Sequence, residues 1–102
     1  MAYTVKGNFD EGLNQWLFNI SGEIDISNAP QLKKDLETAF AQKPADIIAN
    51  VSDLSYIDST GLGAIISVYG KMKKTGHRIV LVEPKDNVKK LLNITSLDKV
   101  LC

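Results

Sequence analysis

The sequence predicts a single α/β domain over residues 1–102, in which a β-hairpin precedes alternating helices and strands. The length of 102 residues is that of one domain. Two short apolar runs rich in branched residues, 46–51 and 78–82, have the composition of buried strands. A stretch with helical periodicity separates them, so the two strands are expected to be parallel in one sheet.

The N-terminal hairpin is predicted from residues 3–5 and 16–20, which are rich in aromatic and branched side chains. The turn-like sequence 10–12 precedes the second of these strands. Because Trp16 and Phe18 alternate with Leu17, one face of this strand should enter the core. The other face should be exposed or covered by the N-terminal strand.

A first helix is expected over about 28–42. Ser27 is its candidate N-cap, and Pro30 falls in the first turn, where the missing N–H of proline is harmless. Apolar residues then recur at helical spacing. These residues are Leu32, Leu36, Ala39 and Phe40.

A second helix should begin at Ser59 and close at Gly76, and a third should follow Pro84. Lysines crowd the last turn of the second helix, where they complement the negative end of the helix dipole. The apolar stripes of the two helices are Leu62, Ile65, Ile66, Tyr69 and Met72 in the second, and Val88, Leu91 and Leu92 in the third.

Composition narrows the functional classes. The 12 basic residues balance the 12 acidic ones, so the chain lacks the positive charge that favours direct nucleic-acid binding. The only cysteine is Cys102, which excludes an intrachain disulfide and a cysteine-based zinc site and fits a reducing, cytoplasmic compartment. No signal peptide and no run of eighteen apolar residues is present, so no membrane partner is expected.

The segment 52–63 is expected to be a loop at the carboxyl end of a strand, where open α/β sheets carry their functional groups. It ends in Asp58-Ser59-Thr60-Gly61-Leu62-Gly63. Two interpretations stay open at this point. In the first, Asp58 or Ser59 is only the N-cap of the helix, and the glycines allow close packing of helix on sheet. In the second, the glycines keep a serine hydroxyl accessible to a partner, at a cost in helix stability of about 1 kcal/mol each relative to alanine. A phosphate on that serine would be stabilised by the helix N-terminus.

Enzymatic activity is not expected. A serine hydrolase would have glycine two residues before the nucleophile, where this chain has Ile57. His77, the only histidine, is expected in an exposed turn rather than as a general base. Gly70-Lys71 is followed by Met72 and therefore does not complete a nucleotide-binding loop.

A divalent cation site is a weaker alternative. Asp25, Asp53 and Asp58 lack the fixed spacing of a metal-ligand motif, so capping roles are favoured. We expect no metal and no cofactor.

The sequence resembles a STAS domain, the sulfate-transporter and anti-sigma-factor antagonist fold, in its stand-alone bacterial form. Two segments carry the resemblance. One is the run 58–63, and the other is Ser21-Gly22-Glu23-Ile24-Asp25-Ile26-Ser27-Asn28-Ala29-Pro30-Gln31-Leu32. The resemblance implies a mixed sheet of about four to five strands with helices packed mainly on one face.

The resemblance also implies a partner-switching function. The unphosphorylated protein would bind an anti-sigma-factor serine kinase and so release a sigma factor. Phosphorylation of Ser59 would end that binding, and a phosphatase would reset the switch. The kinase-binding positions implied are Asp25, Ser27, Asn28, Asp58, Ser59, Thr60, Gly61, Leu62 and Gly63.

Several alternatives remain open from the residues. Leu62 is either a contact for the partner or a core residue. The neighbouring hydroxyls of Ser59 and Thr60 are equivalent on local grounds, and only the family pattern favours Ser59. The other functional candidate is a scaffold or sensor subunit in a different regulatory complex. Family members usually continue beyond the third helix with a further strand and helix, so one side of the sheet is expected to be less covered in this chain. An exposed apolar patch on that side would support a dimer, so the protein is expected to be a monomer or a weak homodimer.

Overall fold

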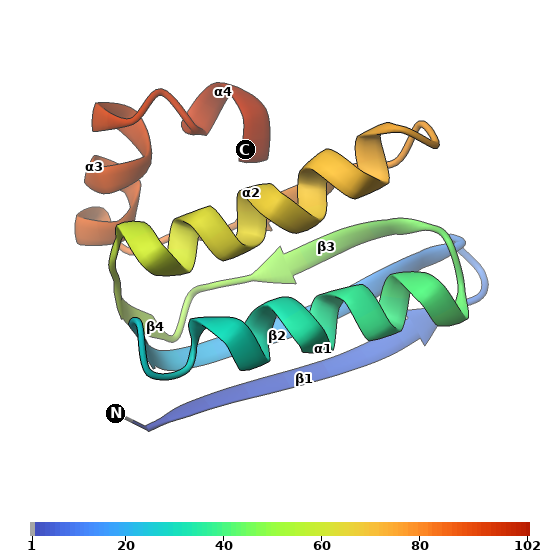
Figure 1. The fold of residues 1–102 in the computed structure, drawn as a ribbon, viewed down its shortest axis with the longest axis horizontal. Coiled ribbons are helices and arrows are strands. Elements are labelled where there is room, and N and C mark those ends of the chain that lie inside the picture. Colours follow the sequence, from blue (N-terminus) through green and yellow to red (C-terminus); the bar gives the residue numbers. More distant parts are fainter. Residues whose placement is uncertain (1) are drawn as a thin grey trace.

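The computed structural model describes residues 2–102 and contains a mixed sheet of five strands with four helices (Figure 1). The elements follow one another as β1 Tyr3–Asp10, β2 Gln15–Ile24, α1 Ala29–Gln42, β3 Asp46–Asn50, β4 Leu54–Ile57, α2 Ser59–Lys73, β5 Ile79–Val82, α3 Asp86–Ile94 and α4 Asp98–Leu101.

The sheet is organised around β2. The β1 strand pairs with β2 in antiparallel register from Tyr3 opposite Gly22 to Asp10 opposite Gln15. On its other edge β2 is parallel to β3, and β3 is parallel to β5. The predicted hairpin and the predicted parallel pairing of the two buried strands are therefore confirmed.

The β4 strand was not predicted, because the sequence analysis assigned its residues to a loop. The strand continues along the edge of β2 beyond β3, with Leu54 opposite Gly22 and Ile57 opposite Ile24. Its buried residues are the first and the last of four, so the strand lacks the alternation that identifies an isolated strand from sequence. Pairing with a distant segment, rather than local composition, defines it.

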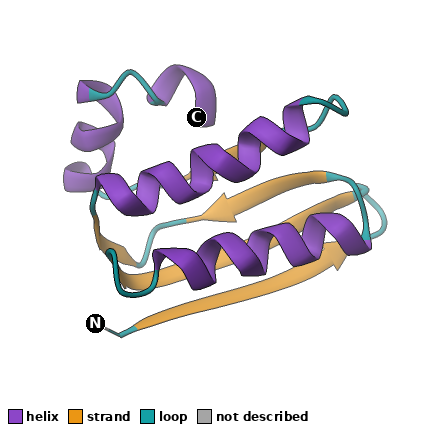
Figure 2. Cartoon of the chain, viewed as in Figure 1, coloured by secondary structure: helices purple, strands orange, loops and turns teal. Residues whose placement is uncertain are grey.

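Both long helices cover the same face of the sheet, as expected (Figure 2). Trp16, Phe18 and Ile20 of β2 point into the core between sheet and helices, whereas Leu17 is 38% exposed on the opposite face. The short helices α3 and α4 lie against β4 and β5 respectively. No helix within residues 2–102 is long and apolar enough to cross a membrane.

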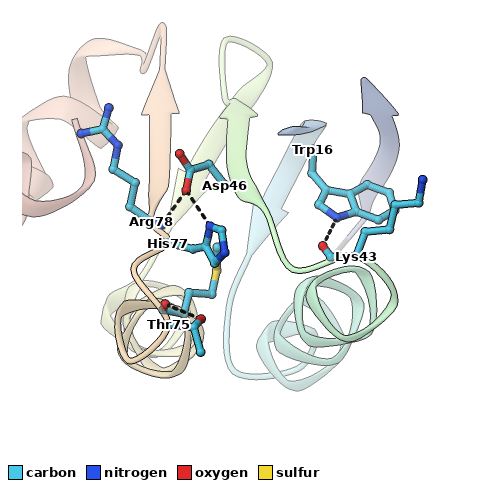
Figure 3. Close-up of polar contacts among 7 residues, drawn as sticks. Trp16, Lys43, Asp46, Thr75, His77 and Arg78 are labelled. Carbon is cyan, nitrogen blue, oxygen red and sulfur yellow. Dashed lines mark hydrogen bonds and ion pairs between the residues drawn. The ribbon is translucent and has the colours of Figure 1, made fainter. Parts of the chain in front are cut away.

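Polar contacts join the starts of β2 and β3 to the segments that follow α1 and α2 (Figure 3). The Trp16 indole Nε1 donates to the Lys43 carbonyl at 3.0 Å and so joins β2 to the end of α1. Asp46, at the start of β3, accepts from the Arg78 backbone N–H at 3.1 Å and lies 3.3 Å from Nδ1 of His77. The His77 side chain is only 28% exposed, so the expectation of an exposed turn residue was wrong.

Candidate functional site

The two sequence motifs meet where β2 and β4 end. Ile24 lies opposite Ile57 in the parallel register, and the Asp58 N–H donates to the Ile24 carbonyl at 3.2 Å. The chain leaves both strands at the same edge of the sheet. The corner 25–28 and the first turn of α2 therefore begin side by side, as Figure 1 shows at the ends of β4 and β2.

Asp58 caps α2. Its backbone is extended, and its side-chain Oδ1 accepts a hydrogen bond from the Gly61 N–H at 2.9 Å. The Leu62 N–H donates to the Asp58 carbonyl at 3.0 Å and closes the first turn. Of the two N-cap candidates in this motif, the structure selects Asp58.

Ser59 and Thr60 are the first two residues of α2 and both are exposed. Within residues 2–102, neither hydroxyl takes part in a side-chain hydrogen bond. Both hydroxyls are therefore available to another molecule, and the geometry leaves open which one a kinase would use.

The two glycines of the motif have different environments. A Cβ atom on Gly61 would lie 2.6 Å from Cγ1 of Ile57 and 2.8 Å from Cγ2 of Ile24. A Cβ atom on Gly63 would have no heavy atom within 4 Å. Close packing therefore explains Gly61 and does not explain Gly63.

Leu62 belongs to the core. Its side chain is 2% exposed and lies in the hydrophobic cluster between the helices and the sheet. Of the two interpretations left open for Leu62, its burial favours the core residue, because helical geometry turns position 62 inward while 59, 60 and 63 face outward.

The corner after β2 is a closed hydrogen-bonded turn. Asp25 Oδ1 accepts from both the N–H and the hydroxyl of Ser27, at 2.8 and 2.5 Å. Asn28 is 6% exposed, and its amide accepts from the Asp25 N–H and donates to the Glu23 carbonyl.

These contacts correct two expectations. Ser27 is not the N-cap of α1, because Asn28 occupies that position, without a capping hydrogen bond from its side chain, and Ser27 binds Asp25 instead. The side chain of Asn28 is buried within the turn, so it supports the corner rather than offering a contact surface.

The electrostatics of the corner favour an ionised Asp25. Hydrogen bonds from the Ser27 hydroxyl and then from the Ser27 N–H hold the pKa of the Asp25 carboxyl below its ordinary value of 3.8. The Asp25 carboxylate, held by its hydrogen bonds from Ser27, therefore presents a fixed negative charge at the surface.

Sequence reasoning missed two exposed apolar residues beside the motif. Ile26 in the corner is 73% exposed, and Tyr56 on β4 is 43% exposed. The sequence did contain a signal for Ile26, because an isoleucine within a polar turn gains no stability from burial in the isolated protein and therefore indicates a contact with another molecule. Tyr56 was hidden by the failure to predict β4.

The described residues 2–102 contain no group of three or more histidine, cysteine, aspartate or glutamate side chains placed to hold a metal ion. Asp25, Asp53 and Asp58, the weaker alternative considered from sequence, therefore do not form a three-carboxylate metal site in this part of the chain.

Comparison with known proteins gives a consistent result. The STAS-domain family model matches residues 6–101. An anti-sigma-B factor antagonist of Bacillus subtilis (strain 168) is 36% identical over 83 residues, which cover 81% of this chain and 75% of that protein.

Solved structures show the same fold. A crystal structure of an anti-sigma factor antagonist from Mycobacterium paratuberculosis aligns with a TM-score of 0.81 at 26% identity, over 98% of this chain and 83% of that one. The antagonist SpoIIAA in its unphosphorylated form aligns with a TM-score of 0.81 at 22% identity, over 99% of this chain and 86% of that one. Its phosphorylated form from Bacillus aligns with a TM-score of 0.69 over 99% of this chain and 89% of that one.

The contrast between the glycines predicts opposite effects on stability within one helix. Gly61→Ala should lower the free energy of unfolding by about 1–3 kcal/mol, because the added methyl collides with Ile24 and Ile57. Gly70→Ala, also in α2 and with open space around it, should raise that free energy by up to about 1 kcal/mol. Urea unfolding of the two variants measures both values, and a stabilising Gly61→Ala would contradict the packing described here.

The corner predicts a change in the titration of Asp25. Ser27→Ala removes the hydroxyl donor, so the pKa of Asp25 should rise toward 3.8, as followed by NMR of its side-chain carboxyl. Because the folded-state pKa is depressed, this contribution to stability is complete well above pH 3.8 and is lost as the pH falls through the folded value. Ser55→Ala is the matched control, since that hydroxyl donates to the Gly22 carbonyl. An unchanged titration in Ser27→Ala would refute the assigned cause.

Proposed function

The chain belongs to the STAS-domain family, and from this premise we propose that it is an anti-sigma-factor antagonist controlled by phosphorylation of Ser59. The unphosphorylated form binds an anti-sigma-factor serine kinase, which then releases its sigma factor. Phosphorylation of Ser59 ends the binding, and a phosphatase restores the first state. The observation that carries this proposal is an exposed Ser59 hydroxyl without a hydrogen-bond partner in residues 2–102, beside a rigid acidic corner.

The relatives support the antagonist role. The Bacillus subtilis protein is named for antagonism of an anti-sigma factor, and SpoIIAA has been observed in unphosphorylated and phosphorylated forms. Those names describe the relatives. They favour for this chain a regulatory function carried by binding rather than by catalysis.

The position of Ser59 suits a phosphate acceptor. It occupies the first turn of a helix of 15 residues, where the positive end of the helix dipole favours added negative charge by roughly 0.3–1 kcal/mol. The Asp58 side chain already holds the Gly61 N–H, so phosphorylation need not remove the cap of the helix. The phosphorylated chain is therefore expected to stay folded.

The same phosphate would oppose binding to the kinase. It adds between one and two negative charges close to Asp58 and Asp25. In the active site of a kinase, the phosphorylated serine would face the phosphates of the nucleotide product, so like charges and added bulk both favour release. Unphosphorylated Ser59 adds neither negative charge nor bulk at this position.

The remaining surface has the composition of a docking site. Asp25 offers a fixed anion for a cationic side chain of the kinase, and the adjacent Ile26 supplies exposed apolar area. Apolar and aromatic residues surrounded by polar ones are typical anchors of protein interfaces. Ile26 is therefore the exposed apolar contact in this proposal, in place of the buried Leu62.

Phosphorylation of this chain by a candidate serine kinase, sought among the genes beside its own, is the first test. Incubation with that kinase and ATP should add one phosphate to the wild type and to Thr60→Ala, and none to Ser59→Ala, as measured by intact mass and peptide mapping. Modification of Ser59→Ala but not of Thr60→Ala would assign the acceptor to Thr60. A wild-type chain that binds the kinase and stays unmodified would favour the scaffold function instead.

A further inference from the structure

An open groove separates the first halves of α1 and α2, next to Ser59. Its volume is about 330 Å³. The residues lining it are Ala29, Pro30 and Lys33 from α1, and Thr60, Gly63, Ala64 and Ser67 from α2. We call this the α1–α2 groove. Both helices begin at the same end of the molecule, so the mouth of the groove adjoins the corner and the first turn of α2 (Figure 1).

The groove exists because its lining side chains are small. Gly63 is exposed, and a Cβ atom there would meet no heavy atom within 4 Å. A larger residue at this position would project into open space and occupy the groove without disturbing the core. Gly70 has equally open space around it but does not line the groove. A larger side chain would therefore fill the groove at position 63 and not at position 70.

The groove is lined by small, mostly apolar residues, by the hydroxyl residues Thr60 and Ser67, and by one cation. Alanine, proline and glycine line most of it, while Lys33 contributes an ammonium group for which no ion pair is found within residues 2–102. Lys71 of α2, by contrast, is paired with Glu37 of α1. Outside the mouth, Asp25 and Asp58 carry negative charge.

We propose that the α1–α2 groove receives one apolar side chain of the anti-sigma-factor kinase, with a neighbouring carboxylate of the kinase paired to Lys33. This inference rests on the proposed function and adds the chemistry of the partner. The charges on this chain favour a complementary kinase surface that carries a cation near Asp25 and a carboxylate near Lys33. A groove that is open rather than enclosed suits a side chain on a protein surface better than a small molecule, whose sites bury most of the ligand.

Filling the groove tests the proposal directly. Gly63→Leu should weaken binding of the kinase that phosphorylates this chain by at least about tenfold, because an interface anchor loses its pocket. Gly70→Leu is the matched control, a substitution of the same size in the same helix, and should leave the dissociation constant unchanged. Thermal unfolding of both variants checks that they fold, and Gly63→Ala should show a smaller loss of affinity if Gly63→Leu fails to fold.

The cation gives a second, independent measurement. Lys33→Glu should weaken binding and should reduce the dependence of the dissociation constant on salt concentration. Lys34→Glu is its control, since the adjacent Lys34 lines a separate groove between α1 and β1. A folded Gly63→Leu variant with wild-type affinity would overturn the groove proposal while leaving the proposed function intact. A wild type that neither binds the kinase nor is phosphorylated would overturn both.

Discussion

The contact of Gly61 with Ile24 and Ile57 is the constraint on which the site depends. No Cβ atom fits between the first turn of α2 and the ends of β2 and β4, so the helix start rests directly on the sheet. The Asp58 cap and the bond from the Asp58 N–H to the Ile24 carbonyl fix the same turn from the other side. The rotation of α2 follows, with Leu62 turned into the core and Ser59 turned outward. The buried contact of Gly61 with Ile24 and Ile57 thus sets the orientation of the exposed Ser59.

The corner after β2 is constructed in a similar way. The buried Asn28 joins the two ends of the turn, Ser27 holds the Asp25 carboxylate, and Ile26 is left exposed. In the proposed function, this corner is a preorganised surface for the kinase, with a fixed anion and an apolar side chain. The only histidine contacts Asp46 and Phe40 beyond the C-terminal end of α2 (Figure 3), whereas Ser59 is the first residue of that helix. This arrangement agrees with a family of regulatory binding proteins.

The sequence was sufficient wherever local patterns define the structure. The hairpin, the three longer helices and the buried strands β3 and β5 follow from apolar periodicity and from the punctuation by proline and glycine. The β4 strand could not be predicted, since it lacks an alternating apolar pattern and is formed by pairing with the distant β2. The different roles of Gly61 and Gly63 were likewise inaccessible, because they depend on what lies opposite each position and not on the residue itself. Leu62 was ambiguous for the same reason.

The central claim is that a phosphate on Ser59 controls affinity for the kinase. The most direct measurement is calorimetric titration of the kinase, loaded with ADP, with the unphosphorylated chain and with the chain phosphorylated at Ser59. The account predicts a dissociation constant at least about tenfold higher for the phosphorylated chain, a difference of about 1.4 kcal/mol or more, with NMR spectra that show the same fold in both forms. Equal affinity of the two forms would contradict it.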